Sequence, residues 1–167
     1  MVWPSLELIL RVWAVDVEVV ESVCTCVESM LRTLGSAARV FVVSFGSALL
    51  AAYKLNALPA ILSTSSVLVL LFGESNPAEV SQIVLELSQA VLSLPEQEVL
   101  QHVHLAQSYF TLWSRCVKSS HATLIEQVQA ALGPTIEFAL RIFKSDFKPL
   151  VTAMLSFLVT PCKTRRV

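Results

Sequence analysis

The side chains best suited to chemistry in this chain of 167 residues are four cysteines and three histidines, and their spacing argues against a catalytic or metal site. His102 and His104 lie two residues apart in a segment with helical periodicity, so their rings would diverge by about 200° and could not readily share a metal. Cys24 and Cys26 have the same spacing, and no second cysteine pair lies near them to complete a zinc site. The absence of a disulfide framework indicates a reducing compartment, the cytoplasm or the nucleus.

Cys116 and His121 flank a predicted turn, and a catalytic dyad could be imagined from them. Such a dyad needs an orienting group and an oxyanion hole, and the sequence suggests neither. The chain also lacks a glycine-rich phosphate loop, a nucleophile elbow and an HExxH helix. The sequence therefore predicts a protein that is not an enzyme and that uses no cofactor and no metal.

Basic residues lie near predicted inter-helix turns in the second half of the chain, with aromatic residues nearby, which raises the question of nucleic-acid binding. The basic residues are Arg115, Lys118, Arg141, Lys144 and Lys148, and the aromatic residues near them are Tyr109, Phe110, Trp113, Phe138 and Phe143. Aromatic residues at helical spacing are more typical of a core than of a base-stacking platform. We interpret the last basic residues, Lys163, Arg165 and Arg166, as a solvated tail and expect no nucleic-acid partner.

The chain is unusually apolar, with 54% hydrophobic and only 15% charged residues and a mean hydropathy of +0.67. Between Val40 and Gly73 only Lys54 is charged, so one alternative is a small helical membrane protein with a hairpin over residues 40–73. Four consecutive hydroxyl residues at 63–66 fit a buried soluble helix equally well, and we expect no membrane partner. Glu7 within the first apolar stretch also argues against a secretory signal.

Hydrophobic periodicity predicts an all-α chain of about eight helices, stacked as antiparallel pairs. The expected helices cover residues 3–13, 17–34, 36–54, 58–72, 76–94, 98–118, 123–143 and 146–161. Asp16 and Asn76 are predicted N-caps, and Gly35 is predicted to end the second helix. A kink is expected in the seventh helix, at Gly133 and Pro134.

One theme, a helix followed by a break and a second helix, repeats along the chain. The first helices of the pairs start near Asp16, Ala57, Val99 and Asp146, about 41 to 47 residues apart, which is the period of HEAT-type repeats. The sequence predicts a HEAT-repeat α-solenoid over residues 1–160, partial because it starts and ends in mid-repeat, followed by a basic tail at 161–167. The second helices (36–54, 76–94 and 123–143) are expected to line the concave face and the first helices the convex face.

Five segments in this order resemble the importin-β (karyopherin) family, in its transportin-SR/importin-13 branch. They are VWPSLELIL at 2–10, VVESVCTCVESMLRTLG at 19–35, LSTSSVLVLLFG at 62–73, SYFTLWSRCVKSSHATLIEQ at 108–127 and MLSFLVT at 154–160. Positions that match the branch patterns are Ser66, Leu68, Val69, Phe72 and Gly73, then Phe110, Leu112, Arg115, Val117 and Leu124.

The resemblance implies a segment of a nuclear transport receptor that binds protein cargo non-covalently and moves between cytoplasm and nucleus. In transportin-SR the helix matching 19–35 carries a row of arginines for phosphorylated Arg-Ser cargo, but the matching positions here are Ser22, Thr25, Glu28 and Arg32. Only Arg32 is retained, so it is the one partner-binding residue that the resemblance implies, and phosphorylated cargo is not expected. The small GTPase Ran would contact the N-terminal repeats of the parent receptor, which this chain lacks.

Overall fold

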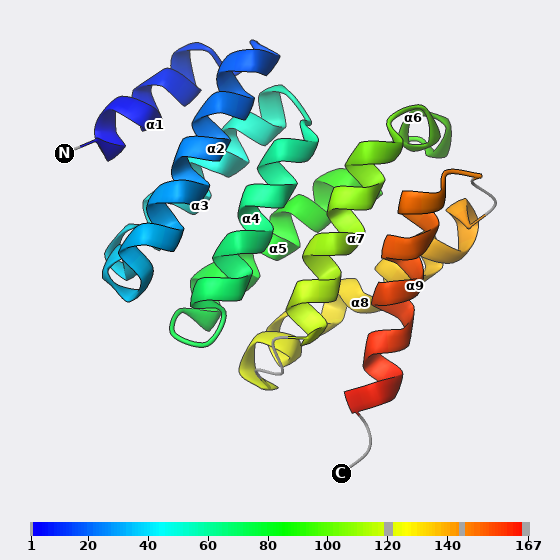
Figure 1. The fold of residues 1–167 in the computed structure, drawn as a ribbon. Coiled ribbons are helices and arrows are strands. Elements are labelled where there is room, and N and C mark those ends of the chain that lie inside the picture. The colour runs from blue at the N-terminus through cyan, green and yellow to red at the C-terminus, as the bar shows by residue number, and fades with distance from the viewer. Residues whose placement is uncertain (1, 119–121, 144–145, 165–167) are drawn as a thin grey trace.

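The computed structural model describes residues 2–118, 122–143 and 146–164, and no strand occurs among them (Figure 1). The described residues form nine α-helices and one 3-10 helix, η1. In order they are α1 (Trp3–Val12), α2 (Val17–Leu34), η1 (Gly35–Phe41), α3 (Val42–Leu55), α4 (Pro59–Phe72), α5 (Pro77–Leu92), α6 (Glu96–Gln101), α7 (Val103–Lys118), α8 (Ala122–Ile142) and α9 (Lys148–Thr164).

The helices stack in two layers, which Figure 1 shows one in front of the other. The first layer consists of α2, α4, α7 and α9, and the second layer of α1, α3, α5 and α8, each helix packing against the next in its layer. Within the first layer the helices begin at Val17, Pro59, Val103 and Lys148, at intervals of 42, 44 and 45 residues. The predicted all-α helical-repeat solenoid is therefore confirmed.

Polar contacts between neighbouring repeats follow the same register. The hydroxyls of Ser63 and Ser108 lie 3.4 Å apart across α4 and α7, at a separation of 45 residues. Ser81 Oγ donates to Gln127 Oε1 at 2.9 Å across α5 and α8, at a separation of 46 residues. These pairs link equivalent positions of successive repeats in both layers.

The predicted ends of α2 are confirmed, and Asn76 occupies the predicted N-cap position of α5 without the expected side-chain bond. Asp16 Oδ1 accepts a hydrogen bond from the Val19 backbone N–H at 3.1 Å, and Gly35 ends the helix with φ of +51°. α5 begins at Pro77 as expected, but the Asn76 side chain makes no capping bond. Asn76 Oδ1 instead accepts from Ser75 Oγ at 3.1 Å.

Two expected helices are interrupted. The segment expected to be helical from Ser36 begins as the 3-10 helix η1, whose tighter turns place Ala38 in the core before α3 starts at Val42. The helix expected over 98–118 is divided at His102, where φ is −107° and ψ is 56°, into α6 and α7. These two breaks explain why the described residues contain more helices than predicted.

Prolines do not end the last two helices. α8 continues through Pro134, and both Gly133 and Pro134 are exposed. The kink expected there stays a prediction. α9 reaches Thr164 instead of ending by Pro161, so the predicted end of this helix is wrong. Residues 165–167 of the predicted tail lie outside the described residues.

Aromatic side chains from the first and second layers form the centre of the core. Phe110 of α7 stacks on Phe138 of α8 with centroids 6.0 Å apart and lies 5.9 Å from Phe157 of α9. Tyr109 and Trp113 are also fully buried, so the predicted core role of these aromatics is confirmed. Phe143 is the exception because its side chain is 44% exposed.

Much of the apolar segment 40–73 is buried between helices, although Val40, Val43, Leu55 and Leu70 are exposed. Val17–Leu55 is long and apolar enough by composition to cross a membrane, but it consists of α2 and α3, which lie in opposite layers and are joined by η1. The buried residues of α4 occur on all its sides, because α2, α5 and α7 surround it. Contacts between helices therefore account for part of the hydropathy that suggested a membrane hairpin.

Candidate protein-binding surfaces

The helix that carries the single retained arginine, α2, presents that residue at the surface. Arg32 is exposed in the last turn of α2 and has no hydrogen bond or ion pair to any described residue. Glu28, one turn earlier on the same side, is half-buried and accepts a hydrogen bond from Thr64 Oγ1 of α4 at 3.1 Å. Arg32 therefore lies on the α4 side of α2, next to a carboxylate that would repel an anionic ligand.

Hydroxyl groups along the exposed face of α2 are already bonded within the helix. Thr25 Oγ1 donates to the Glu21 carbonyl at 3.0 Å, Ser29 Oγ to the Thr25 carbonyl at 3.0 Å, and Thr33 Oγ1 to the Ser29 carbonyl at 2.8 Å. A bound phosphate would need several convergent donors. On this face of α2 the only arginine available to a phosphate is Arg32.

Further along the first layer, two basic side chains donate hydrogen bonds to neighbouring helices of the layer. Arg115 Nη1 donates to Ser66 Oγ at 2.7 Å, and Ser66 Oγ donates to the Ser63 carbonyl, so the guanidinium joins α7 to α4. Lys118 Nζ donates to Ser156 Oγ at 3.2 Å and joins α7 to α9. These two basic residues thus hold the layer together, and Lys144 lies outside the described residues.

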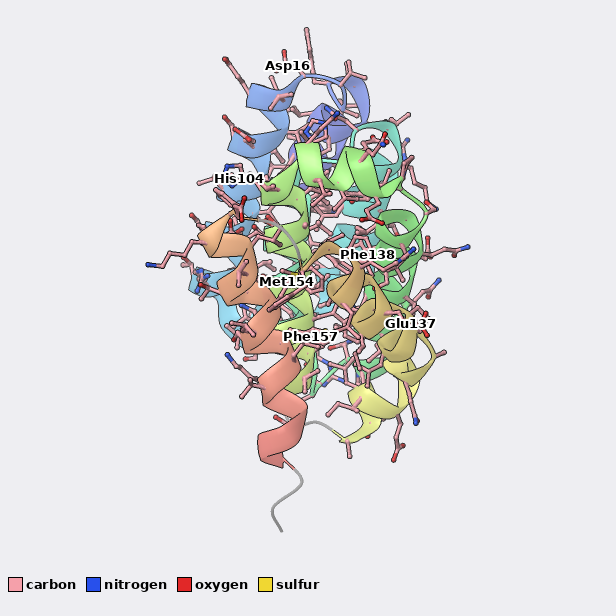
Figure 2. All side chains as sticks on the ribbon, turned by 90° about the vertical axis from the view of Figure 1, so that its right-hand side faces the viewer. Asp16, His104, Glu137, Phe138, Met154 and Phe157 are labelled. Carbon is pink, nitrogen blue, oxygen red and sulfur yellow. The ribbon has the colours of Figure 1, made fainter. Side chains whose placement is uncertain are left out.

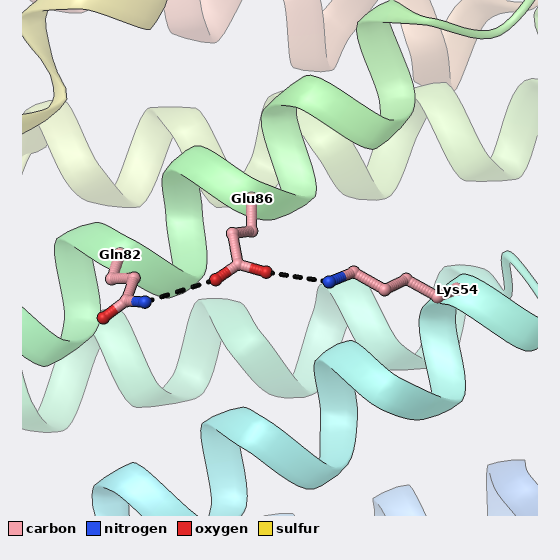
Figure 3. Close-up of polar contacts among 3 residues, drawn as sticks. All are labelled: Lys54, Gln82 and Glu86. Atoms are coloured by element: carbon pink, nitrogen blue, oxygen red, sulfur yellow. Dashed lines mark hydrogen bonds and ion pairs between the residues drawn. The ribbon is translucent and has the colours of Figure 1, made fainter.

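The second layer presents longer side chains of both charges. Lys54 Nζ of α3 pairs with Glu86 Oε2 of α5 at 3.0 Å, and Gln82 Nε2 donates to Glu86 Oε1 at 3.3 Å (Figure 3). Glu137 of α8 is exposed and points away from the first layer in Figure 2. Arg141, also exposed, lies with its Cζ 5.8 Å from the centroid of Phe138.

The imagined cysteine–histidine dyad has a poor nucleophile. Cys116 is fully buried, and that burial raises the pKa of its thiol to about 12, so the thiolate is scarce at neutral pH. Burial likewise raises the pKa of Cys24 to about 11. His121 lies outside the described residues.

The two neighbouring histidines do not form a metal site. His104 makes an edge-on contact with Phe147, with ring centroids 5.2 Å apart, while His102 occupies the break between α6 and α7. Among the described residues no group of three or more histidines, cysteines or carboxylates could hold a metal ion.

Two surface cavities were not predicted from the sequence. A groove of about 590 Å³ runs beside α2 and is lined by Val2, Trp3, Cys26, Ser29, Met30, Thr33, Leu34 and Phe41. A second cavity of about 490 Å³, here named the α6 pocket, lies where the N-terminal ends of α2, α4 and α7 meet α6. His102, at the break between α6 and α7, is among the residues that line the α6 pocket, and no glycine or proline marks this break in the sequence.

Comparison with known proteins identifies a family for the first part of this chain. Residues 1–100 match the family described as the Transportin-3/Importin-13 fourth TPR domain. No match is found among curated proteins. The intervals of 42 to 45 residues between first-layer helices are longer than the 34-residue repeat from which the term TPR derives.

Proposed function

Because the chain belongs to the transportin-3/importin-13 branch of the importin-β family, we propose that it serves as a protein-binding scaffold for cargo in a nuclear transport receptor. Members of this family are transport receptors and not enzymes. Binding is non-covalent, and cytoplasm and nucleus are the compartments in which the chain acts. The helical-repeat stack supports this function because such arrays offer an extended surface built from successive helices.

The second layer is the proposed cargo face. The observation that supports this assignment most strongly is the contrast between the two layers. The exposed hydroxyls of α2 in the first layer are bonded to its own carbonyls, although Arg32 is exposed on the same helix. The second layer exposes long polar side chains such as Lys54, Glu137 and Arg141. Long side chains of both signs can reach a folded partner and orient it by complementary charge.

Arg32 is proposed as a lesser contact on the first layer. It is exposed and unpaired among the described residues, so it can meet an acidic group of a partner. A single exposed ion pair contributes only about 0.2–1 kcal/mol, and Glu28 opposes it. Arg32 therefore assists binding without determining which cargo is chosen.

Affinity capture on the immobilised chain tests the cargo face. Nuclear extract is passed over the wild-type chain and over the variants Arg141→Glu and Arg32→Glu, and bound proteins are quantified by mass spectrometry. We expect specific proteins whose recovery falls roughly fivefold with Arg141→Glu and less with Arg32→Glu, because charges on the contact face steer and orient a partner. Circular dichroism verifies that both variants remain folded.

Addition of Ran-GTP provides a further control. We expect it to leave capture by this chain unchanged, because the resemblance places the Ran contacts in N-terminal repeats of the parent receptor. Equal capture by wild type and Arg141→Glu, or a greater loss with Arg32→Glu, would refute the second layer as the cargo face. The absence of any specifically bound protein would refute the scaffold function.

A further inference from the structure

The stack of helices ends in two faces, one formed by α1 and α2 and the other by α8 and α9 (Figure 1). Within the first layer α2 packs against α4, and α9 packs against α7. In the second layer α1 packs against α3, and α8 packs against α5. Each of these four helices therefore has a side, opposite its neighbour in the layer, where no further helix of the described residues lies.

The side of α2 that lies opposite α4 is apolar. Glu28 faces α4, because it accepts the hydrogen bond from Thr64. At about 100° per residue, Cys26 and Met30 lie about 160° around the helix from Glu28. Both line the groove of about 590 Å³ beside α2, together with Trp3 of α1. The groove therefore opens on the end of the stack.

The first helix, α1, extends this apolar surface into the second layer. Glu7 and Arg11 face α3, since they line a cavity together with Ala48 of that helix. Ile9 lies about 160° around α1 from each of them, and it is 36% exposed. Trp13, directly after α1, is 54% exposed. We name the groove beside α2, together with Ile9 and Trp13, the α2 end face.

The side of α9 that lies opposite α7 is also apolar. Ser156 faces α7, because its hydroxyl accepts the hydrogen bond from Lys118. At about 100° per residue, Val151 and Leu158 lie about 140–160° around α9 from Ser156. Leu155 lies about 100° from Ser156, and it is 44% exposed. A row of aliphatic side chains therefore follows α9 on the end of the stack.

The helix beneath it, α8, extends this row into the second layer, and Figure 2 shows α8 and α9 together from this end. Gln127 faces α5, because its side-chain oxygen accepts the hydrogen bond from Ser81. Three half-buried apolar residues lie about 140–180° around α8 from Gln127, namely Ile125, Leu132 and Ile136. Together with the row on α9 they form the α9 end face. Both ends of the stack are thus apolar in both layers.

The two first-layer helices at the ends carry opposite charge. α2 contains three glutamates and one arginine, a formal charge of −2, whereas α9 contains two lysines and no acidic residue, a formal charge of +2. Glu18, Glu21 and Lys148 are exposed. The two end faces therefore attract each other, whereas two α2 end faces or two α9 end faces repel.

Packing within the first layer shows how a second copy of the chain fits. Ser63 of α4 and Ser108 of α7 lie 45 residues apart in the sequence and 3.4 Å apart in space, so neighbouring helices of this layer are parallel and in register. The step that relates α7 to α9, applied once more, places α2 of a second copy against α9 with their N-terminal ends together. Lys148 of one copy then lies near the acidic start of α2 of the other.

We propose that copies of this chain dock end to end, with the α9 end face of one copy against the α2 end face of the next. Leu155 enters the groove beside α2, and the apolar side chains of α8 cover Ile9 and Trp13. Because the two faces differ, each added copy leaves one of each open, so association continues beyond the dimer. This self-association goes beyond the cargo-scaffold function and leaves the exposed side of the second layer accessible.

Sedimentation velocity and light scattering on the full chain test the proposal. We expect the mean mass to rise with concentration past that of a dimer. Leu155→Glu should raise the dissociation constant at least roughly tenfold, because it replaces a buried aliphatic side chain with a charge that faces the acidic α2. Leu70→Glu is the matched control, since Leu70 is 54% exposed on α4 in the middle of the stack, and it should leave the association unchanged.

A mixing experiment tests whether the two faces meet each other. Ser29→Lys places a positive charge in the groove beside α2, where Ser29 is an exposed lining residue, and should also prevent association by repelling α9. Each of the two variants, Ser29→Lys and Leu155→Glu, keeps one face intact. At a concentration where each alone is a monomer, an equal mixture should form a complex of two chains and nothing larger. Circular dichroism verifies that all variants remain folded.

Each contrary outcome overturns the proposal in a different way. A monomeric mass at all concentrations would exclude self-association, and a wild-type mass that stops at the dimer would show that identical faces meet. An equal effect of Leu70→Glu and Leu155→Glu would place the contact elsewhere, and a mixture that stays monomeric would show that the two faces do not meet. None of these results alters protein capture by the second layer, which is measured separately with Arg141→Glu.

Discussion

At the residue scale, a buried hydrogen bond between Ser88 and Trp113 links the two layers. Trp113 Nε1 of α7 donates to Ser88 Oγ of α5 at 3.1 Å, and both side chains are fully buried. Ser88→Ala would leave the indole N–H without its partner, so we expect the free energy of unfolding to fall by about 1–3 kcal/mol. Urea denaturation monitored by circular dichroism measures the change.

Two further variants show whether the bond itself causes that loss. Ser93→Ala removes an exposed hydroxyl just after α5 and should change stability by less than about 0.5 kcal/mol. In a double-mutant cycle, Ser88→Ala should cost less when Trp113 is already phenylalanine. Strict additivity would show that the two residues do not interact.

Buried thiols and phenols make the stability depend on alkaline pH. Burial raises the pKa of Cys116 from its ordinary 9.0 to about 12 and that of Cys24 to about 11, and it also raises the pKa values of Tyr53 and Tyr109. The unfolded chain therefore loses these protons first. The stabilisation is fully present below about pH 9 and is lost as the pH rises towards 12.

The urea midpoint checks this dependence directly. The urea midpoint should be lower at pH 10.5 than at pH 8. In a separate measurement at pH 8, a thiol reagent should leave the thiol of Cys116 unmodified while the chain is folded. An unchanged or higher midpoint at pH 10.5 would contradict the burial of these four groups.

At the element scale, α3 and α5 approach most closely at a glycine. A Cβ built on Gly46 would lie 2.7 Å from Ile83 Cγ1 and would also collide with Ile83 Cδ1. Gly46→Ala should therefore destabilise the protein by about 1–3 kcal/mol, although alanine favours helices, because overpacking outweighs propensity. Thermal or urea unfolding measures the effect.

Shortening the opposing side chain should relieve the collision. Ile83→Ala alone leaves a cavity, but combined with Gly46→Ala it should cost less than the sum of the single changes. Ser47→Ala, on the exposed side of α3, serves as a neutral comparison. A stabilising effect of Gly46→Ala would show that α3 and α5 are not in close contact there.

Several elements were predictable from local signals, and others were not. Asp16 and Gly35 mark the ends of α2 through a side-chain acceptor and a positive φ, both of which depend on residue type. Asn76 has the same cap preference and occupies the N-cap position of α5, but its side-chain oxygen accepts from the Ser75 hydroxyl and from no backbone N–H of α5. The break at His102 lies at no glycine, proline or other turn residue, so no local signal marked it.

The candidate sites also divide into one that the sequence indicated and two that it did not. The resemblance alone drew attention to Arg32, and the structure leaves it exposed on α2. The α6 pocket and the groove beside α2 were not predicted, because each is lined by residues from three or more separate segments of the chain. Spacing along one helix cannot indicate such a cavity.

At the scale of the whole molecule, we propose different tasks for the two layers. Aromatic contacts among α7, α8 and α9 and polar links such as Arg115 to Ser66 make the stack rigid. A rigid stack keeps the exposed side chains of the second layer in fixed relative positions, which reduces the entropy lost on binding a partner. The proposed scaffold function thus follows from the stack as a unit and not from any single residue.

Hydrogen–deuterium exchange on the chain, with and without a purified partner obtained by affinity capture, tests this account most directly. We predict slower exchange in α3, α5 and α8 when the partner is bound, with the outer first-layer helices α2 and α9 unchanged. Protection confined to α2, α4, α7 and α9, or no protection in any helix, would contradict the assignment of the second layer as the cargo face.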